Sequence, residues 1–196
     1  MNRNCIRIGI TGGIGSGKSQ VSHLIRTMGY PVYDADTESK RLCNEDPVLR
    51  RALTEAFGEV YHADGTLNRQ RLAEILFSDK RQLARANAII HPAVQSDYLA
   101  WSSRQGVYPV FVESAILLES ILKRAVDSVI VVTADETERI ERILLRDRCS
   151  PDMARRRMDS QMSDGERIVH ADYVIRNNNS DLVIPQVEKI VAAITG

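Results

Sequence analysis

The segment from Gly12 to Ser19 has the strongest chemical signature in this sequence, because it matches the pattern G-x-x-x-x-G-K-[ST] at every fixed position. In such a loop the glycines let backbone N–H groups turn inward around phosphate oxygens. Lys18 can then reach the β- and γ-phosphates of a nucleoside triphosphate, and the hydroxyl of Ser19 suits Mg²⁺. The alternative is a glycine-rich turn without a ligand, which is disfavoured because a strand-like segment precedes the loop and a helix-like one follows it. The predicted nucleotide contacts are Gly13, Ile14, Gly15, Ser16, Gly17, Lys18, Ser19 and Gln20.

Acidic residues follow two other strand-like segments. Asp34 and Asp36 come after the second of these segments along the chain. Phosphoryl transfer to an alcohol needs a carboxylate that orients the hydroxyl group and accepts its proton, and a second acid near Mg²⁺ helps to neutralise charge. Residues two apart on an extended segment share a face, so both roles stay open for both aspartates, and either could instead cap the next helix. Glu113, after the apolar run Val110–Val112, could hold Mg²⁺ through water.

The pattern of the whole chain predicts the elements that position these residues. Five apolar or β-branched segments predict strands over residues 5–10, 30–33, 108–112, 126–132 and 173–175. Helical periodicity is found over 18–28 and over 182–194. Residues 37–104 show only helical patterns, punctuated by glycines and by prolines such as Pro92, which predicts a helical insertion. Strands that alternate with helices predict an α/β fold with a parallel sheet.

An arginine-rich segment over residues 139–157 predicts a helix, a short loop and a second helix. Ser150-Pro151 fits the N-cap and first position of the second helix, and Thr133 and Glu136 have the spacing of a capping box before the first. We expect most of these arginines on solvated helix faces with acidic partners one turn away. A mobile arginine could also neutralise charge on a phosphoryl group in transfer. The seven are Arg139, Arg142, Arg146, Arg148, Arg155, Arg156 and Arg157.

The composition excludes several classes of function. The 196 residues include 26 basic and 26 acidic side chains, so the net charge is zero, which argues against binding nucleic acid or an anionic membrane by bulk charge. No apolar run approaches the roughly 18 residues needed to span a bilayer, and we find no signal-peptide pattern, so we expect a cytoplasmic protein. Cys5, Cys43 and Cys149 are far apart and are expected to be free thiols. The D-x-x-G and N-K-x-D patterns of GTP switches are absent.

Five motifs, in chain order, resemble the dephospho-CoA kinase family. They are T-G-G-I-G-S-G-K-S at 11–19, D-A-D at 34–36, I-I-H-P at 89–92, L-L-E at 117–119 and R-M-D-S-Q at 157–161. The resemblance implies that ATP, with Mg²⁺, donates its γ-phosphate to the ribose 3′-hydroxyl of a small-molecule partner, dephospho-CoA, in the final step of coenzyme A biosynthesis. It also implies a P-loop NTPase three-layer fold, with residues 1–196 as a single kinase domain. Its parts would be a core (about 1–36, 106–145 and 165–196), an inserted helical substrate domain (about 37–105) and a helical lid (about 146–164).

The same resemblance implies roles for individual residues. Asp36 matches the family's proposed base, Lys18 belongs to the ATP cradle and Arg146 matches a lid arginine that reaches the phosphates, so these three are the expected catalytic residues. Ser19 and Asp34 are the expected Mg²⁺ ligands, and Arg142 is a further expected ATP contact. The expected substrate contacts are Asp36, His91, Glu113 and Arg157. Many family members have the pattern D-x-P-L-L-x-E, whereas this chain has a glutamate, Glu113, in the first position and no proline.

Two other functions remain as alternatives. Another small-molecule or nucleoside monophosphate kinase would use the same cradle and lid. The basic residues of the insertion do not distinguish such an enzyme from a dephospho-CoA kinase, since dephospho-CoA itself contains a pyrophosphate that basic residues could bind. A protein that binds ATP without transferring phosphate is disfavoured, because binding alone does not require a base such as Asp36. The sequence leaves monomer and homo-oligomer equally open.

Overall fold

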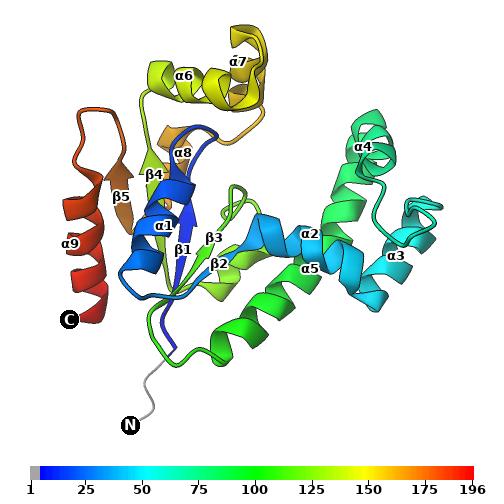
Figure 1. The fold of residues 1–196 in the computed structure, drawn as a ribbon, viewed down its shortest axis with the longest axis horizontal. Helices are drawn as coiled ribbons and strands as arrows, with labels where there is room; N and C mark the ends of the chain where they lie inside the picture. Colours follow the sequence, from blue (N-terminus) through cyan, green and yellow to red (C-terminus); the bar gives the residue numbers. More distant parts are fainter. Residues whose placement is uncertain (1–4) are drawn as a thin grey trace. The chain divides into compact units, whose positions relative to one another are not determined.

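The computed structural model describes residues 5–196, with side chains for all of these except Phe77, Ser78 and Lys80. The chain divides into two compact units (Figure 1). The first unit combines the residues up to Tyr33 with Ser102–Gly196, and the second is Asp34–Trp101.

The first unit is built on a five-stranded parallel sheet, which confirms the predicted α/β fold. The strand order is β2-β3-β1-β4-β5, so β1 lies in the centre with β3 and β4 as its neighbours. Interior strands of a parallel sheet are covered on both faces, which explains why β3 and β4 are almost continuously apolar. The strands are β1 (Arg7–Thr11), β2 (Val32–Asp34), β3 (Val110–Glu113), β4 (Ser128–Thr133) and β5 (Tyr173–Arg176).

Helices of the first unit cover the sheet. Figure 1 shows α1 beside α9, and buried residues of both helices, such as Ile25 and Val191, share one apolar core with Ile10 and Ile130 of the sheet. The helix α8 lies against β4, and α6 contacts α7. The helical segments are α1 (Lys18–Thr27), the 3-10 helix η1 (Ile121–Ala125), α6 (Glu136–Asp147), α7 (Pro151–Asp159), α8 (Asp164–Val169) and α9 (Val183–Thr195).

The second unit is helical. Its helices are α2 (Ala35–Glu45), α3 (Pro47–Phe57), α4 (Arg69–Ser78) and α5, which continues past the unit's last residue (Lys80–Ser103). The carboxylate of Asp46 accepts hydrogen bonds from the backbone N–H groups of Val48 and Leu49, so it caps α3 directly after α2 ends. The helix α5 continues through Pro92, although a proline inside a helix removes one backbone hydrogen bond. Tyr98 of the same helix is fully buried.

The structure also bears on the predictions about membrane spans and cysteines. Within residues 5–196, no helix combines the length and the apolar character needed to cross a membrane. Cys5, Cys43 and Cys149 are free thiols, as predicted.

Candidate active site

The glycine-rich loop lies between β1 and α1, at the carboxyl end of the central strand. Gly15 and Gly17 have φ values of 80° and 90°, a left-handed backbone that favours glycine. A Cβ atom at Gly17 would lie 2.0 Å from Nδ2 of Asn177, so a side chain there would also collide with the loop that follows β5. Both the turn of the loop and its close packing therefore require glycine at Gly17.

Side-chain donors hold five successive carbonyl groups of this loop. Lys18 Nζ donates to the carbonyls of Gly12 and Gly13 at 2.9 and 3.4 Å. Arg139 Nε donates to the Ile14 carbonyl at 2.9 Å and Arg142 Nη1 to the Gly15 carbonyl at 3.3 Å. Asn177 Nδ2 donates to the Ser16 carbonyl at 2.8 Å. With its carbonyls bound in this way, the loop can present N–H groups on its other side.

The N–H groups of the loop fit a phosphate group. Within residues 5–196, the N–H groups of Gly15, Gly17 and Ser19 donate to no acceptor of the protein. The helix α1 begins at Lys18, so the positive end of its dipole lies at the same place. Unpaired N–H groups, a helix N-terminus and a lysine are together the features that suit the phosphates of a nucleotide.

A hydroxyl and a carboxylate meet beside this loop. Ser19 Oγ donates to Glu113 Oε1 at 3.0 Å, and Glu113 is the last residue of β3 and is 8% exposed. The structure therefore brings together a predicted Mg²⁺ ligand and a predicted substrate contact. Hydroxyl and carboxylate oxygens are the hard donors that Mg²⁺ prefers, and Mg²⁺ usually keeps several waters and takes one or two carboxylates. The pair fits the Mg²⁺ of a nucleotide complex.

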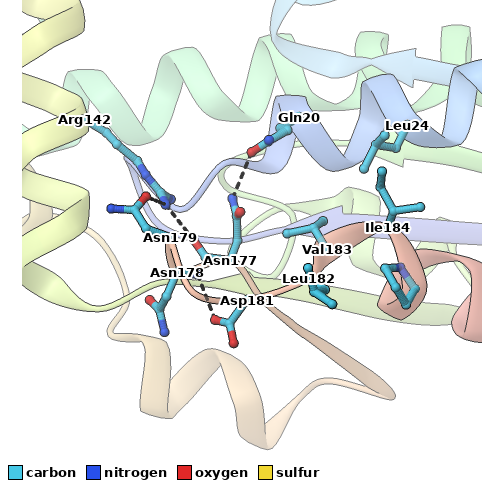
Figure 2. A pocket seen from close by; sticks show the side chains of 11 residues that line it. Gln20, Leu24, Arg142, Asn177, Asn178, Asn179, Asp181, Leu182, Val183 and Ile184 are labelled. Carbon is cyan, nitrogen blue, oxygen red and sulfur yellow. Dashed lines mark hydrogen bonds between the residues drawn. The ribbon is translucent and has the colours of Figure 1, made fainter.

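A pocket of about 570 Å³ opens next to the loop, between α1 and the segment that joins β5 to α9 (Figure 2). Arg142 and Gln20, both predicted ATP contacts, line it. Arg142 Nη2 donates to Glu138 Oε2 at 3.0 Å and to the Asn177 carbonyl at 2.7 Å. Leu24 and the start of α9 supply an apolar wall. The pocket therefore combines apolar surface with a fixed guanidinium group beside the phosphate loop.

The other two predicted arginines share a carboxylate outside the loop. Arg146 forms a bidentate ion pair with Asp147, with distances of 2.7 and 3.0 Å, and Arg157 contacts the same carboxylate at 2.7 Å. The hydrogen bond from Arg146 lowers the pKa of Asp147 and raises that of Arg146. Both arginine side chains are about half exposed to solvent or more. Arg146 and Arg157 thus meet at the carboxylate of Asp147. Among the described residues, neither arginine has a hydrogen bond to the loop.

Three predicted site residues belong to the second unit. Asp34 ends β2 and caps α2, because its carboxylate accepts hydrogen bonds from the N–H groups of Asp36 and Thr37 and from the Thr37 hydroxyl. Asp36 lies in the first turn of α2 and is exposed. His91 lies in α5, and partial burial lowers the pKa of its imidazole. Capping was a predicted alternative for both aspartates, and Asp34 is the one that caps the helix.

Three residues at the loop were not among the predicted contacts. Arg139 was expected on a solvated helix face, Asn177 belongs to a predicted turn, and Gln161 ends one of the family motifs. In the structure Arg139 and Asn177 are buried, and Gln161 Oε1 accepts a hydrogen bond from the Ile14 N–H at 2.8 Å. Signals were available for two of the three: Gln161 belongs to the motif at 157–161, and Arg139 lies three residues before Arg142 in one helix, so both arginines occupy the same face of α6.

A parallel sheet of this order, with a phosphate loop after its central strand, is the fold of a P-loop kinase. The dephospho-CoA kinase family model matches residues 6–182. A dephospho-CoA kinase from Bacteroides fragilis is 43% identical over 188 residues, which cover 95% of this chain and 92% of the relative. The chain therefore belongs to the dephospho-CoA kinase family.

Solved structures agree with this fold. A crystal structure from Thermus thermophilus has a TM-score of 0.84 and 33% sequence identity, over 99% of this chain and 100% of that one. A dephospho-CoA kinase from Campylobacter jejuni has a TM-score of 0.71 over 96% of both chains, and at 23% identity this match supports the fold alone.

Proposed function

We propose that this protein is an enzyme that transfers the γ-phosphate of ATP to the ribose 3′-hydroxyl of dephospho-CoA, giving coenzyme A and ADP. The observation that supports the proposal best is the match of residues 6–182 to the dephospho-CoA kinase family, together with a relative that is 43% identical over 95% of the chain. The phosphate loop and the Ser19–Glu113 pair provide the chemistry that such a transfer needs.

The nucleotide would bind through the loop and the neighbouring pocket. Its phosphates would accept hydrogen bonds from the N–H groups of Gly15, Gly17 and Ser19. Lys18 would exchange its bonds to the loop carbonyls for bonds to the β- and γ-phosphates. The ATP base would lie in the pocket beside Arg142 and Gln20, where apolar surface and a planar cation suit a heteroaromatic ring.

In the transfer step the 3′-oxygen of the acceptor attacks the γ-phosphorus. A new O–P bond forms as the bond to the bridging oxygen of ADP breaks, and the hydroxyl proton passes to the carboxylate that we assign to Asp36. We infer this role from the family resemblance and from the position of Asp36 directly after β2. The acceptor would also contact His91 and Glu113.

Mg²⁺ would be held by Ser19 and by an acid, for which Asp34 and Glu113 are the candidates. When bound, Mg²⁺ neutralises charge on the β- and γ-phosphate oxygens. Ser19 and Glu113 already lie 3.0 Å apart. Asp34 also caps α2, so we expect its replacement to affect the helix as well as the metal.

We further propose a three-part organisation for the kinase domain. Residues of about 1–36, 106–145 and 165–196 would be the core, about 37–105 the substrate domain and about 146–164 a lid. In the lid, Arg146 would leave Asp147 and neutralise the phosphoryl group, with Arg157 close by on the acceptor side. Closure would exclude water, which otherwise competes as the acceptor.

An ADP-release assay tests the proposal. The protein is mixed with ATP and Mg²⁺ and with dephospho-CoA, nucleoside monophosphates or no acceptor, and product masses are determined. The expected result is a gain of one phosphate on dephospho-CoA alone. Transfer to a nucleoside monophosphate instead would support the alternative kinase function, and no transfer to any acceptor would support nucleotide binding alone.

The role of Asp36 needs a separate variant. Asp36→Asn keeps the size of the side chain and removes its ability to accept a proton. We expect turnover to fall by about a hundredfold or more, with the affinity for ATP nearly unchanged. Turnover close to that of the unmodified protein would refute the assignment of Asp36 as the base.

A further inference from the structure

Ile14 is held at both of its backbone groups by side chains from distant parts of the chain. Its N–H donates to Gln161 Oε1 at 2.8 Å, and its carbonyl accepts from Arg139 Nε at 2.9 Å. Gln161 lies between α7 and α8, and Arg139 lies in α6. The contact at the N–H fixes the orientation of the Gln161 amide, since only its oxygen can accept. Two segments more than a hundred residues away thus meet on one residue of the phosphate loop.

Arg139 is anchored on its other side by a carboxylate. Its Nη1 donates to Asp164 Oδ2 at 3.0 Å, and Arg167 Nη1 donates to Asp164 Oδ1 at 3.1 Å. The side chains of Arg139 and Arg167 are 8% and 2% exposed. Burial lowers the pKa of Arg139, and the charge of Asp164 opposes this effect. Asp164 is therefore the shared counterion of two buried guanidinium groups, and one of these, that of Arg139, contacts the loop.

The carboxylate is itself held in place. Asp164 is the first residue of α8, where a negative charge is favourable. The same helix begins with a capping box, in which Ser163 and Glu166 bond to each other's backbone N–H groups. Asp164 therefore projects from a well-defined helix start.

The loop packs directly on Arg139. A Cβ atom at Gly13 would lie 2.1 Å from Arg139 Nη2, and one at Gly15 would lie 2.7 Å from the Arg139 carbonyl oxygen. Glycine at these two positions thus permits the guanidinium group and the backbone of α6 to lie against the outer side of the loop.

We propose that Arg139 and Gln161 are positioning residues for phosphoryl transfer, which clamp Ile14 and so fix the shape of the phosphate loop before the nucleotide binds. This inference rests on the proposed kinase function. A loop that is already in its binding conformation loses less entropy when it orders around a ligand, so the clamp raises the affinity for ATP. It also holds the loop N–H groups where charge develops during transfer. Neither residue needs to touch the reacting atoms.

Gln161→Leu removes the acceptor for the Ile14 N–H at nearly constant size. Gln186→Leu is the matched control, because the Gln186 side chain also accepts a backbone N–H, that of Arg176 at 3.0 Å, but joins β5 to α9. Affinity for the Mg²⁺ complex of a non-hydrolysable ATP analogue is measured by calorimetry, kcat and KM by ADP release, and Tm by circular dichroism.

We expect Gln161→Leu to weaken binding of the analogue by about fivefold to tenfold, the loss typical of one hydrogen bond, and to lower kcat as well. Gln186→Leu should lower Tm without changing affinity. Equal affinities for the two variants would refute the clamp. Tighter binding by Gln161→Leu would also refute it, since Gln161 would then compete with phosphate for the Ile14 N–H.

A second variant tests the other half of the clamp. Arg139→Lys keeps a cation for Asp164 but loses the Nε donor of the guanidinium group. We expect it to weaken binding of the analogue as Gln161→Leu does, while unmodified affinity would refute the role of Arg139. These affinities are measured without an acceptor. An inert dephospho-CoA would therefore refute the proposed function and leave the test of the clamp intact.

Discussion

Gly17 offers a sharp test of how the phosphate loop is built, because the chain contains a matched control. Gly17 and Gly29 both have φ values of 90°, at the two ends of α1. A Cβ atom at Gly17 would lie 2.0 Å from Asn177 Nδ2, whereas one at Gly29 would meet nothing within 4 Å. Each alanine would therefore have to adopt the same left-handed φ, and only Gly17→Ala adds a collision.

The structure gives the size of each effect. Left-handed backbone costs a non-glycine residue about 1–2 kcal/mol, which applies to both variants. Asn177 is 4% exposed and donates to the Ser16 carbonyl at 2.8 Å and to Gln20 Oε1 at 3.3 Å. Its displacement by the new methyl group would break both hydrogen bonds, at about 1 kcal/mol each. We expect Gly29→Ala to lose about 1–2 kcal/mol of unfolding free energy and Gly17→Ala about 3–4 kcal/mol.

Thermal unfolding and nucleotide titration check these values together. A loss of 1 kcal/mol shifts the Tm of a chain of this size by about 2–4 °C, so the two variants should be separated by roughly 5 °C. Gly29→Ala should bind ATP normally, and Gly17→Ala should bind it at least about tenfold more weakly, because the collision with Asn177 displaces the loop and its N–H groups. Equal Tm values, or normal ATP affinity in Gly17→Ala, would refute the account of Asn177 as the support of the loop.

Two further predictions concern acid and imidazole groups. Glu113→Gln keeps an acceptor for the Ser19 hydroxyl but removes the charge, so we expect the Mg²⁺ concentration for half-maximal rate to rise about tenfold, and an unchanged Mg²⁺ titration would contradict this role. Burial lowers the pKa of His91 below its ordinary value of about 6.5, so the unfolded chain binds more protons than the folded one just below that pH. The contribution of His91 to stability is thus complete above pH 6.5 and is lost as the pH falls toward its folded pKa. Urea unfolding at pH 7.5 and 5.5 should show that His91→Gln loses less unfolding free energy at the lower pH than the unmodified protein does. Equal losses in the two proteins would refute this prediction.

The elements that depend on local sequence were predicted well. All five strands were found, with ends that differ by at most two residues, because each is a short apolar run bounded by turn residues. Ser150-Pro151 caps α7 as predicted, with the Ser150 hydroxyl accepting from the Met153 N–H. A cap involves residues only two or three apart, so the local pattern contains all the information needed.

The capping box predicted for Thr133 and Glu136 is wrong, and the reason is tertiary. Thr133 ends β4, where it pairs with Arg176, and its carbonyl accepts the Asn177 N–H. The N-cap of α6 is Asp135. The pairing of β4 with β5 decides where the strand ends, and this partner lies some forty residues away in the sequence. Local spacing could not reveal it.

The arginine-rich segment shows why two interpretations of a charged helix face need not exclude each other. Arg142 does form the expected ion pair with an acidic residue one turn away, Glu138. That pair also fixes the guanidinium group, so that its other donors reach the Gly15 and Asn177 carbonyls. Arg146 lies on the same face one turn later, yet its neighbour Asp147 binds it instead. The periodicity of α6 therefore predicts which arginines share a face, but the acid that each one meets decides which of them supports the phosphate loop.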